Sequence, residues 1–197
     1  MQRRFILASG SPRRRQLLSA AGYKFEVVSP PIDEVAHGWL TVRELTIWNA
    51  AAKAARVSKM SPDAVVLAAD TLVTIDGEVL GKPVDLEDAV RILRRLSGRA
   101  HEVWTAVRIC HGARGRSQSF HEVSRVHFRK LDDHAIRDYL AKIDPLDKAG
   151  AYAAQGHGAE IIERIDGSYS NVVGLPMEAT TRALRAFGIE WGVANLS

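Results

Sequence analysis

Hydrophobic and polar residues alternate along this chain in patterns that predict both strands and helices. Continuous apolar runs at residues 5–9 and 65–69 are typical of strands buried on both faces. A shorter run at residues 25–28 predicts another strand. Between the runs at residues 5–9 and 25–28, Ser11 and Pro12 suit the cap and first position of a helix that ends near residue 22. The pattern therefore predicts a strand–helix–strand unit in the N-terminal part of the chain.

Four further helices are predicted by capping residues followed by helical spacing. A capping box at residues 41–44 opens the first of them. Its expected buried face consists of Leu45, Trp48, Ala52 and Ala55. The other three begin after Asp85, after Asp132 or Asp133, and at Pro176.

Strand and turn signals alternate with these helices. Asp76-Gly77 separates two β-rich runs and predicts a tight hairpin. The remaining expected strands, with the two hairpin arms, are residues 72–75, 78–80, 103–109, 124–128, 161–162 and 172–173. Mixing strand–helix units with hairpins predicts an α/β fold, with a two-lobed mixed central sheet and flanking helices. We expect one domain spanning residues 1–197.

Composition fits a globular cytoplasmic protein. The chain has 197 residues, of which 46% are hydrophobic and 25% charged, so it is long enough to bury a sizeable core. Its one cysteine, Cys110, excludes an internal disulfide and fits a reducing compartment. The sequence has no run of about 18 apolar residues, the length needed for a membrane span. We therefore expect a soluble, cytoplasmic protein.

Positive charge is concentrated at one end of the sequence. The net charge is +4, and residues 1–25 contain six basic residues and no acidic one. The rest of the chain carries 21 basic and 23 acidic residues. Such a distribution favours a local anion site over the extended basic surface that long nucleic acids require.

The segment from Ser9 to Arg14 is the clearest candidate anion site. A strand, a glycine turn and a helix start present free backbone N–H groups, which attract anions. Arg13 and Arg14 add guanidinium groups that fit phosphate oxygens. The segment lacks the Gly-Lys-Ser/Thr ending of a Walker loop. On spacing alone, a polyphosphate site and a capped helix with a basic surface remain equally good interpretations.

Asp70 is the second candidate, because we expect the buried strand at residues 65–69 to end there. A carboxylate in that position needs a partner, and it can hold Mg²⁺ or activate water. An ordinary turn-capping aspartate explains the same pattern equally well.

Other polar residues are weaker candidates when each is taken alone. Lys82, between Gly81 and Pro83, could neutralise a phosphate, and Lys53 could extend along the edge of an apolar helix face. Asp33 and Glu34 could hold a metal, although acids in loops are usually solvated. Gln155 lies in the small-residue segment 147–156, and its amide could read the edge of a base. Tight packing between a helix and a sheet explains the same segment.

Several common catalytic designs are absent from the sequence. The seven histidines and one cysteine show no zinc-ligand spacing. There is also no Gly-x-Ser-x-Gly nucleophile elbow. Structural zinc and acyl transfer therefore have no support.

Taken together, these motifs resemble the Maf family of nucleotide pyrophosphatases over nearly the whole chain. The resemblance rests on residues 7–14, 33–34, 53–54, 69–71, 81–83, 97–98, 147–152 and 171–176. It implies a fold like that of inosine triphosphate pyrophosphatases. It also implies hydrolysis of a nucleoside triphosphate to the monophosphate and pyrophosphate.

The same resemblance assigns roles to individual residues. It identifies Asp70 as the catalytic proton acceptor. The residues that it implies handle phosphate and metal are Ser11, Arg14, Glu34, Lys53 and Lys82. It further implies a divalent cation, Mg²⁺, Mn²⁺ or Co²⁺, with Asp70 and Glu34 as its expected ligands.

Three positions separate the branches of the family. Arg13, Thr71 and Gln155 match the branch that accepts dTTP and UTP, with CTP and modified pyrimidine nucleotides as further substrates. The sister branch, which resembles 7-methyl-GTP pyrophosphatases, typically has Trp, Gln and Glu at these positions. A neutral amide also complements the edge of T or U. The resemblance therefore favours pyrimidine triphosphates over 7-methyl-GTP.

Two questions remain open from sequence. A non-catalytic regulator of cell division that binds nucleotide or RNA is the competing function, although the slightly acidic remainder of the chain argues against long nucleic acid. The resemblance also implies a homodimer. Trp39 and Trp191 could lie in its interface or in ordinary packing.

Overall fold

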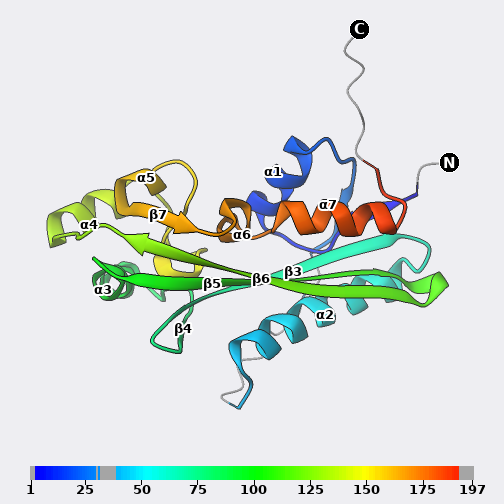
Figure 1. Cartoon of the computed structure of the whole chain (residues 1–197), viewed down its shortest axis with the longest axis horizontal. Coiled ribbons are helices and arrows are strands. Elements are labelled where there is room, and N and C mark those ends of the chain that lie inside the picture. The colour runs from blue at the N-terminus through cyan, green and yellow to red at the C-terminus, as the bar shows by residue number, and fades with distance from the viewer. Residues whose placement is uncertain (1–2, 30, 32–38, 191–197) are drawn as a thin grey trace, which may run out of the picture. The chain divides into compact units, whose positions relative to one another are not determined.

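The computed structural model describes residues 3–29, 31 and 39–190 of the chain (Figure 1). The helices and strands are, in chain order, β1 (Phe5–Leu7), α1 (Pro12–Ala20), β2 (Glu26–Val27), α2 (Val42–Met60), β3 (Val65–Ile75), β4 (Glu78–Leu80), α3 (Leu86–Leu96), β5 (Ala100–His111), β6 (Arg116–Phe128), α4 (Asp133–Leu140), α5 (Gly158–Ile161), β7 (Ile162–Asp166), α6 (Tyr169–Val173) and α7 (Met177–Ala186). Short 3-10 turns occur at η1 (Gly112–Arg114) and η2 (Ala149–Ala151). None of the described helices is long and apolar enough to cross a membrane.

Among the described residues, seven strands form one mixed sheet. Its order is β2-β1-β3-β5-β6-β7, and β4 pairs with β3 off this path. β1 is parallel to β2 and β3, whereas the β3–β4 and β6–β7 pairs are antiparallel. The predicted α/β class with a mixed central sheet and flanking helices is confirmed.

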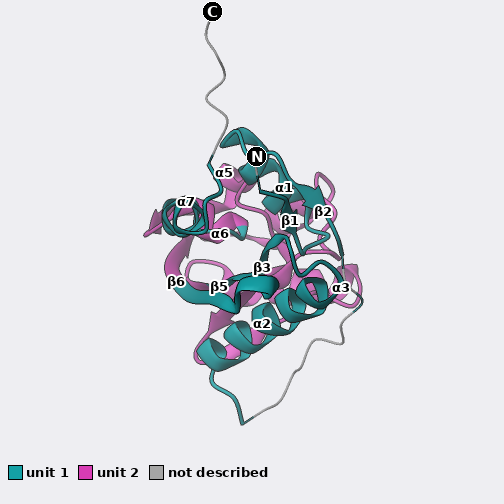
Figure 2. Ribbon diagram, turned by 90° about the vertical axis from the view of Figure 1, so that its right-hand side faces the viewer, with its two compact units in different colours: residues 1–70, 105–122, 174–197 teal, residues 71–104, 123–173 magenta. Residues whose placement is uncertain are grey.

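The chain divides into two compact units, shown in different colours in Figure 2. Unit 1 contains residues 1–70, 105–122 and 174–197, and unit 2 contains residues 71–104 and 123–173. The strands β3, β5 and β6 each contribute residues to both units.

Unit 1 has two hydrophobic layers that follow the alternation of side chains along β1 and β3. Leu7 and Leu67 pack with Leu18 of α1 and Leu184 of α7. Neighbouring residues such as Val66 pack instead against α2. Because successive strand residues face opposite sides, α1 and α7 cover one face of this part of the sheet and α2 covers the other (Figure 1).

Unit 2 has its own core, in which α3 packs against α4. Three rings, those of His101, Phe128 and Tyr152, meet edge to face with centroids 4.9–5.3 Å apart. This cluster fixes the start of the segment that leads to Gln155.

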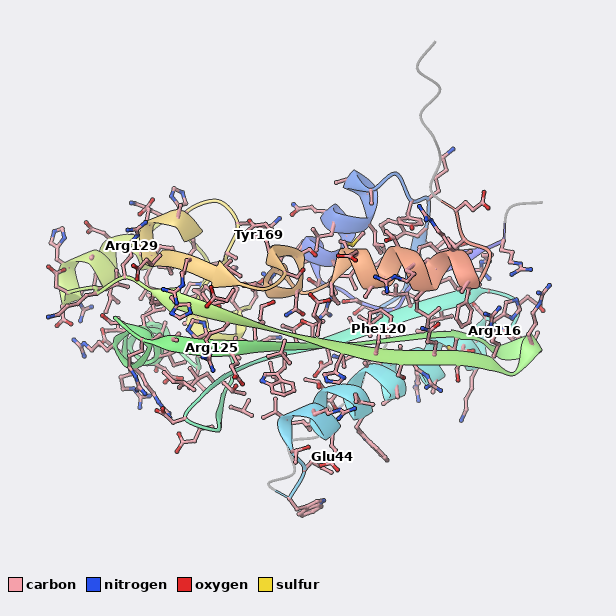
Figure 3. The ribbon with its side chains drawn as sticks, in the orientation of Figure 1. Glu44, Arg116, Phe120, Arg125, Arg129 and Tyr169 are labelled. Atoms are coloured by element: carbon pink, nitrogen blue, oxygen red, sulfur yellow. The ribbon has the colours of Figure 1, made fainter. Side chains whose placement is uncertain are left out.

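The local signals for helix starts and turns are confirmed. The side chains of Ser11, Thr41, Asp85 and Asp132 each accept a hydrogen bond from the backbone N–H three residues later. Thr41 and Glu44 form the complete capping box, and Glu44 is labelled at the start of α2 in Figure 3. Asp76 and Gly77 both have positive φ, as a type I′ hairpin turn requires.

The predicted buried face of α2 is confirmed at Leu45 and wrong at Trp48 and Ala55. Trp48 is 60% exposed and Ala55 is exposed, whereas Asn49 and Ala50 are buried. The helix is rotated so that Ala54 packs against strand residues of the sheet, and Asn49 of the same helix contacts Asp70. The size and hydrophobicity of Trp48 therefore do not predict which side of α2 faces the sheet.

Three further details of the predicted strands are corrected. β3 does not end at Asp70 but continues to Ile75, where its second half pairs with β4. Ile161 is the last residue of helix α5, and residues 172–173 belong to helix α6, so neither lies in a strand. Ser168 explains this helix, because its hydroxyl and carbonyl accept the backbone N–H groups of Asn171 and Val172.

Candidate functional site

Asp70 lies inside β3, with its side chain on the face that α2 covers. It follows Val66 and Ala68 at two-residue intervals, and both of those pack against α2. The Lys53 ammonium donates to Oδ1 of Asp70 at 2.6 Å, and the Asn49 amide donates to Oδ2 at 3.3 Å. The side chains of Lys53 and Asp70 are only 14% and 6% exposed, so this is a largely desolvated ion pair. The carboxylate thus has the partners that its burial requires.

The second part of the site in unit 1 is the turn from β1 into α1. The Ser11 hydroxyl accepts from the backbone N–H of Arg14 at 3.4 Å. The hydroxyl of buried Ser9 accepts from Nη1 of Arg14 at 3.0 Å and from the backbone N–H of Ser11 at 3.3 Å. Arg14 also donates from Nε to the carbonyl of Gly174 at 2.8 Å. Its guanidinium therefore holds the turn in place, and Arg13 lies half-buried on the first turn of α1.

Within unit 2, the turn that carries Lys82 is tied to the segment that leads to Gln155. The backbone N–H of Gly150 donates to the carbonyl of Gly81 at 3.0 Å. Pro83 is buried and Lys82 itself is exposed. The lysine thus projects from a turn anchored on both sides.

The segment before Gln155 is held by unusual backbone and by buried polar contacts. Gly150 and Ala151 have φ of 72° and 60°, the left-handed region that is costly for alanine. The Tyr152 hydroxyl and Nε2 of His101 share a hydrogen bond of 2.7 Å. Gln155 follows in a bend, half-buried. A strained and well-anchored segment suits a residue that must be held in one place.

We expect His101 to make the stability of the protein depend on pH. Burial, with a smaller contribution from the charge of His127, lowers the pKa of His101 from its ordinary 6.5 to about 4. Between these values the unfolded chain binds a proton that the folded chain does not. The free energy of unfolding should therefore fall as pH drops from 6.5 towards 4, by at most about 1.4 kcal/mol per pH unit from this group.

Urea unfolding between pH 7 and pH 4.5 tests this expectation. The variant His101→Phe should be less stable at pH 7, because it leaves the Tyr152 hydroxyl unpaired, but its stability should fall less steeply with acid. His134→Gln, at an exposed position, should keep the wild-type slope. Identical slopes for His101→Phe and the wild type would contradict the assignment.

The predicted site residues are divided between the two units and the part of the chain that the structure does not describe. Ser11, Arg13, Arg14, Lys53 and Asp70 belong to unit 1, and Thr71, Lys82 and Gln155 belong to unit 2. Glu34, predicted as a metal ligand, and its neighbour Asp33 lie outside the described residues. Within the described ranges, no group of three or more His, Cys, Asp or Glu side chains is placed to hold a metal ion.

Sequence reasoning missed two contributors to the site. Asn49 is the first. Its position one helical turn before Lys53 is the sequence signal that places both side chains on the same helix face. Gly174 lies within the motif at residues 171–176, and the hydrogen bond that its carbonyl accepts from Arg14 joins positions 160 residues apart. No local pattern encodes that contact.

Comparison with solved structures finds distant likenesses. One is the nucleoside-triphosphatase, or dITP/XTP pyrophosphatase, of Mycobacterium abscessus, at 15% identity and a TM-score of 0.45, covering 94% of this chain and 97% of that one. Another is a HAM1 protein from Coxiella burnetii, at 19% identity and a TM-score of 0.47, covering 66% of this chain and 75% of that one.

Comparison of sequences gives a much stronger result. A dTTP/UTP pyrophosphatase of Pelotomaculum thermopropionicum is 46% identical over 183 residues, covering 93% of this chain and 96% of the relative. One from Bacillus velezensis is 44% identical over 190 residues, covering 96% and 100%. The model of the family described as Maf-like protein matches residues 4–187. The chain therefore belongs to the Maf family.

Proposed function

We propose that this protein hydrolyses dTTP and UTP to the nucleoside monophosphate and pyrophosphate. The observation that carries the proposal is the desolvated Lys53–Asp70 pair, which sets a carboxylate and a cation side by side on one face of unit 1. The relatives that match nearly the whole chain at 40–46% identity are named dTTP/UTP pyrophosphatases.

The turn from β1 into α1 is the proposed grip on the triphosphate. The N-terminal end of α1 favours negative charge, because the helix dipole is positive there. Arg13 supplies a guanidinium from the first turn. Arg14 is held by Ser9 and Gly174, so its charge is fixed in place before any substrate binds. A preorganised charge loses little freedom when phosphate arrives.

Asp70 and Lys53 are the proposed catalytic pair. Asp70 accepts the proton of the attacking water as general base. Lys53 stabilises the negative charge that grows on the transferred and leaving phosphates. Their burial strengthens both effects, because electrostatic interactions weaken in bulk water.

A divalent cation, Mg²⁺, Mn²⁺ or Co²⁺, is part of the proposal. Mg²⁺ in phosphate-transferring sites is commonly bound by one or two carboxylates, with substrate oxygens and water completing its shell. A single carboxylate such as Asp70 fits that pattern, and Glu34 is the second ligand predicted from sequence. When bound, such a cation neutralises charge on the phosphate oxygens.

Residues of unit 2 supply the proposed base preference and further charge. Thr71 and Gln155, with Arg13 of unit 1, are the residues expected to favour pyrimidines. The neutral amide of Gln155 can both donate to and accept from the base. The exposed ammonium of Lys82 is expected to neutralise phosphate charge.

Location and assembly complete the proposal. We expect the reaction in the cytoplasm, in keeping with the single cysteine. The homodimer stays a prediction. Of the two tryptophans proposed for its interface, Trp39 is 79% exposed and Trp191 lies outside the described residues.

A panel of triphosphates tests the proposal. The protein is incubated with dTTP, UTP, CTP, 7-methyl-GTP and GTP, each with Mg²⁺ or Mn²⁺, and pyrophosphate is measured. We expect the highest kcat/KM with dTTP and UTP. A preference for 7-methyl-GTP would assign the sister branch instead. No release with any triphosphate would favour a non-catalytic regulator.

A further inference from the structure

Asn49 is a buried polar residue on a helix face that is otherwise mostly apolar. It lies on α2 with only 4% of its surface exposed, among buried residues that include Leu45, Ala50 and Val57. Burying an amide without hydrogen bonds costs free energy. The hydrogen bond from its Nδ2 to Oδ2 of Asp70, at 3.3 Å, gives that amide a partner.

Asn49 and Lys53 act on the same carboxylate from one helix. They are four residues apart, so their side chains lie one turn apart on the same face. Lys53 contacts Oδ1 and Asn49 contacts Oδ2, so each oxygen of Asp70 has its own donor. A single flexible ammonium would leave the carboxylate free to turn about its Cβ–Cγ bond. A second donor on the other oxygen fixes the plane of the group.

We propose that Asn49 is a positioning residue that sets the orientation of the Asp70 carboxylate for catalysis. The inference rests on the proposed function, in which Asp70 accepts a proton from water. Proton transfer requires the accepting oxygen to point at its donor within hydrogen-bond reach. Small errors in such alignment are costly in rate. Asn49 contributes by limiting the rotation of Asp70.

The first test replaces the amide with a side chain of similar size. Asn49→Leu should lower kcat for dTTP by about 10-fold with little change in KM, because positioning matters in the transition state more than in substrate binding. The matched control is Thr46→Val on the same buried helix face. The Thr46 hydroxyl donates to the carbonyls of Val42 and Arg43 in its own helix, so this variant should keep wild-type kcat.

The second test distinguishes positioning from a general structural role. If Asn49 acts through Asp70, Asn49→Leu should change the residual rate by less than about twofold in an Asp70→Asn background. The same fold loss in both backgrounds would overturn the inference, and so would a raised KM with unchanged kcat. If Asn49→Leu does not fold, Asn49→Ser replaces it, since the shorter hydroxyl side chain should also fail to hold Asp70.

The wild-type measurement separates this inference from the proposed function. Absence of pyrophosphate release by the wild-type protein would refute the proposed function, and the inference with it. Release by the wild type together with unimpaired kcat in Asn49→Leu would overturn the inference alone. A kcat loss that disappears in the Asp70→Asn background supports both.

Discussion

Replacing Asp70 with asparagine should lower the turnover of dTTP by roughly 100-fold or more. The substitution keeps the shape of the side chain and removes the group that accepts the proton of water. It also removes the negative partner of Lys53 at a position where both groups are nearly dry. Steady-state kinetics at saturating dTTP and metal measure the effect.

Asp63→Asn is the matched control for this experiment. Asp63 belongs to the same unit but lies exposed in the turn between α2 and β3. Its replacement should leave turnover unchanged, since exposed substitutions away from a site have small effects. Near-normal turnover in Asp70→Asn would show that Asp70 is not the base.

Replacing Lys53 with methionine should reduce both stability and turnover. Methionine keeps most of the stem but leaves the buried Asp70 carboxylate without its cation. Removing one partner of a buried pair typically costs about 3 kcal/mol or more. Urea unfolding at pH 7 measures the loss of stability, and dTTP turnover should fall as well, because the cation that stabilises phosphate charge is gone.

Two comparisons make the Lys53 result interpretable. Lys59→Met, at an exposed position of the same helix, should change stability by no more than about 0.5 kcal/mol. The double variant Lys53→Met/Asp70→Asn should lose less unfolding free energy than the sum of the losses in the two single variants, because it contains no unpaired buried charge. Simple additivity would mean that the two side chains are not coupled.

Local chemistry made the helix starts and tight turns predictable from sequence. Ser11, Thr41 and Asp85 cap helices through bonds to residues three positions away, and such contacts need no knowledge of the rest of the fold. The same holds for the Asp76-Gly77 hairpin, whose backbone demands positive φ. These features depend on only a few consecutive residues.

The rotation of α2 could not be predicted in this way. Trp48 is large and apolar, and periodicity therefore assigned it to the core, yet it is exposed. The helix instead presents Asn49 and Lys53 to Asp70, and its small residue Ala54 packs against the strands. That choice depends on a carboxylate in β3, a tertiary contact that no pattern within the helix contains.

The candidate site was predicted from sequence only in part. Family resemblance assigned Asp70 and Lys53 to it, and the structure joins them by a buried ion pair. The bond from Arg14 to Gly174 links distant segments, so no local pattern could reveal it. Thr71, Lys82 and Gln155 remain predictions about unit 2 that rest on the resemblance.

Product analysis with dTTP is the most direct test of the central claim. The wild-type protein is incubated with dTTP and a divalent cation, and the products are separated by anion exchange or followed by phosphorus NMR. Cleavage between the α and β phosphates predicts dTMP and pyrophosphate in equal amounts. Formation of dTDP and inorganic phosphate, or no turnover at all, would contradict the account.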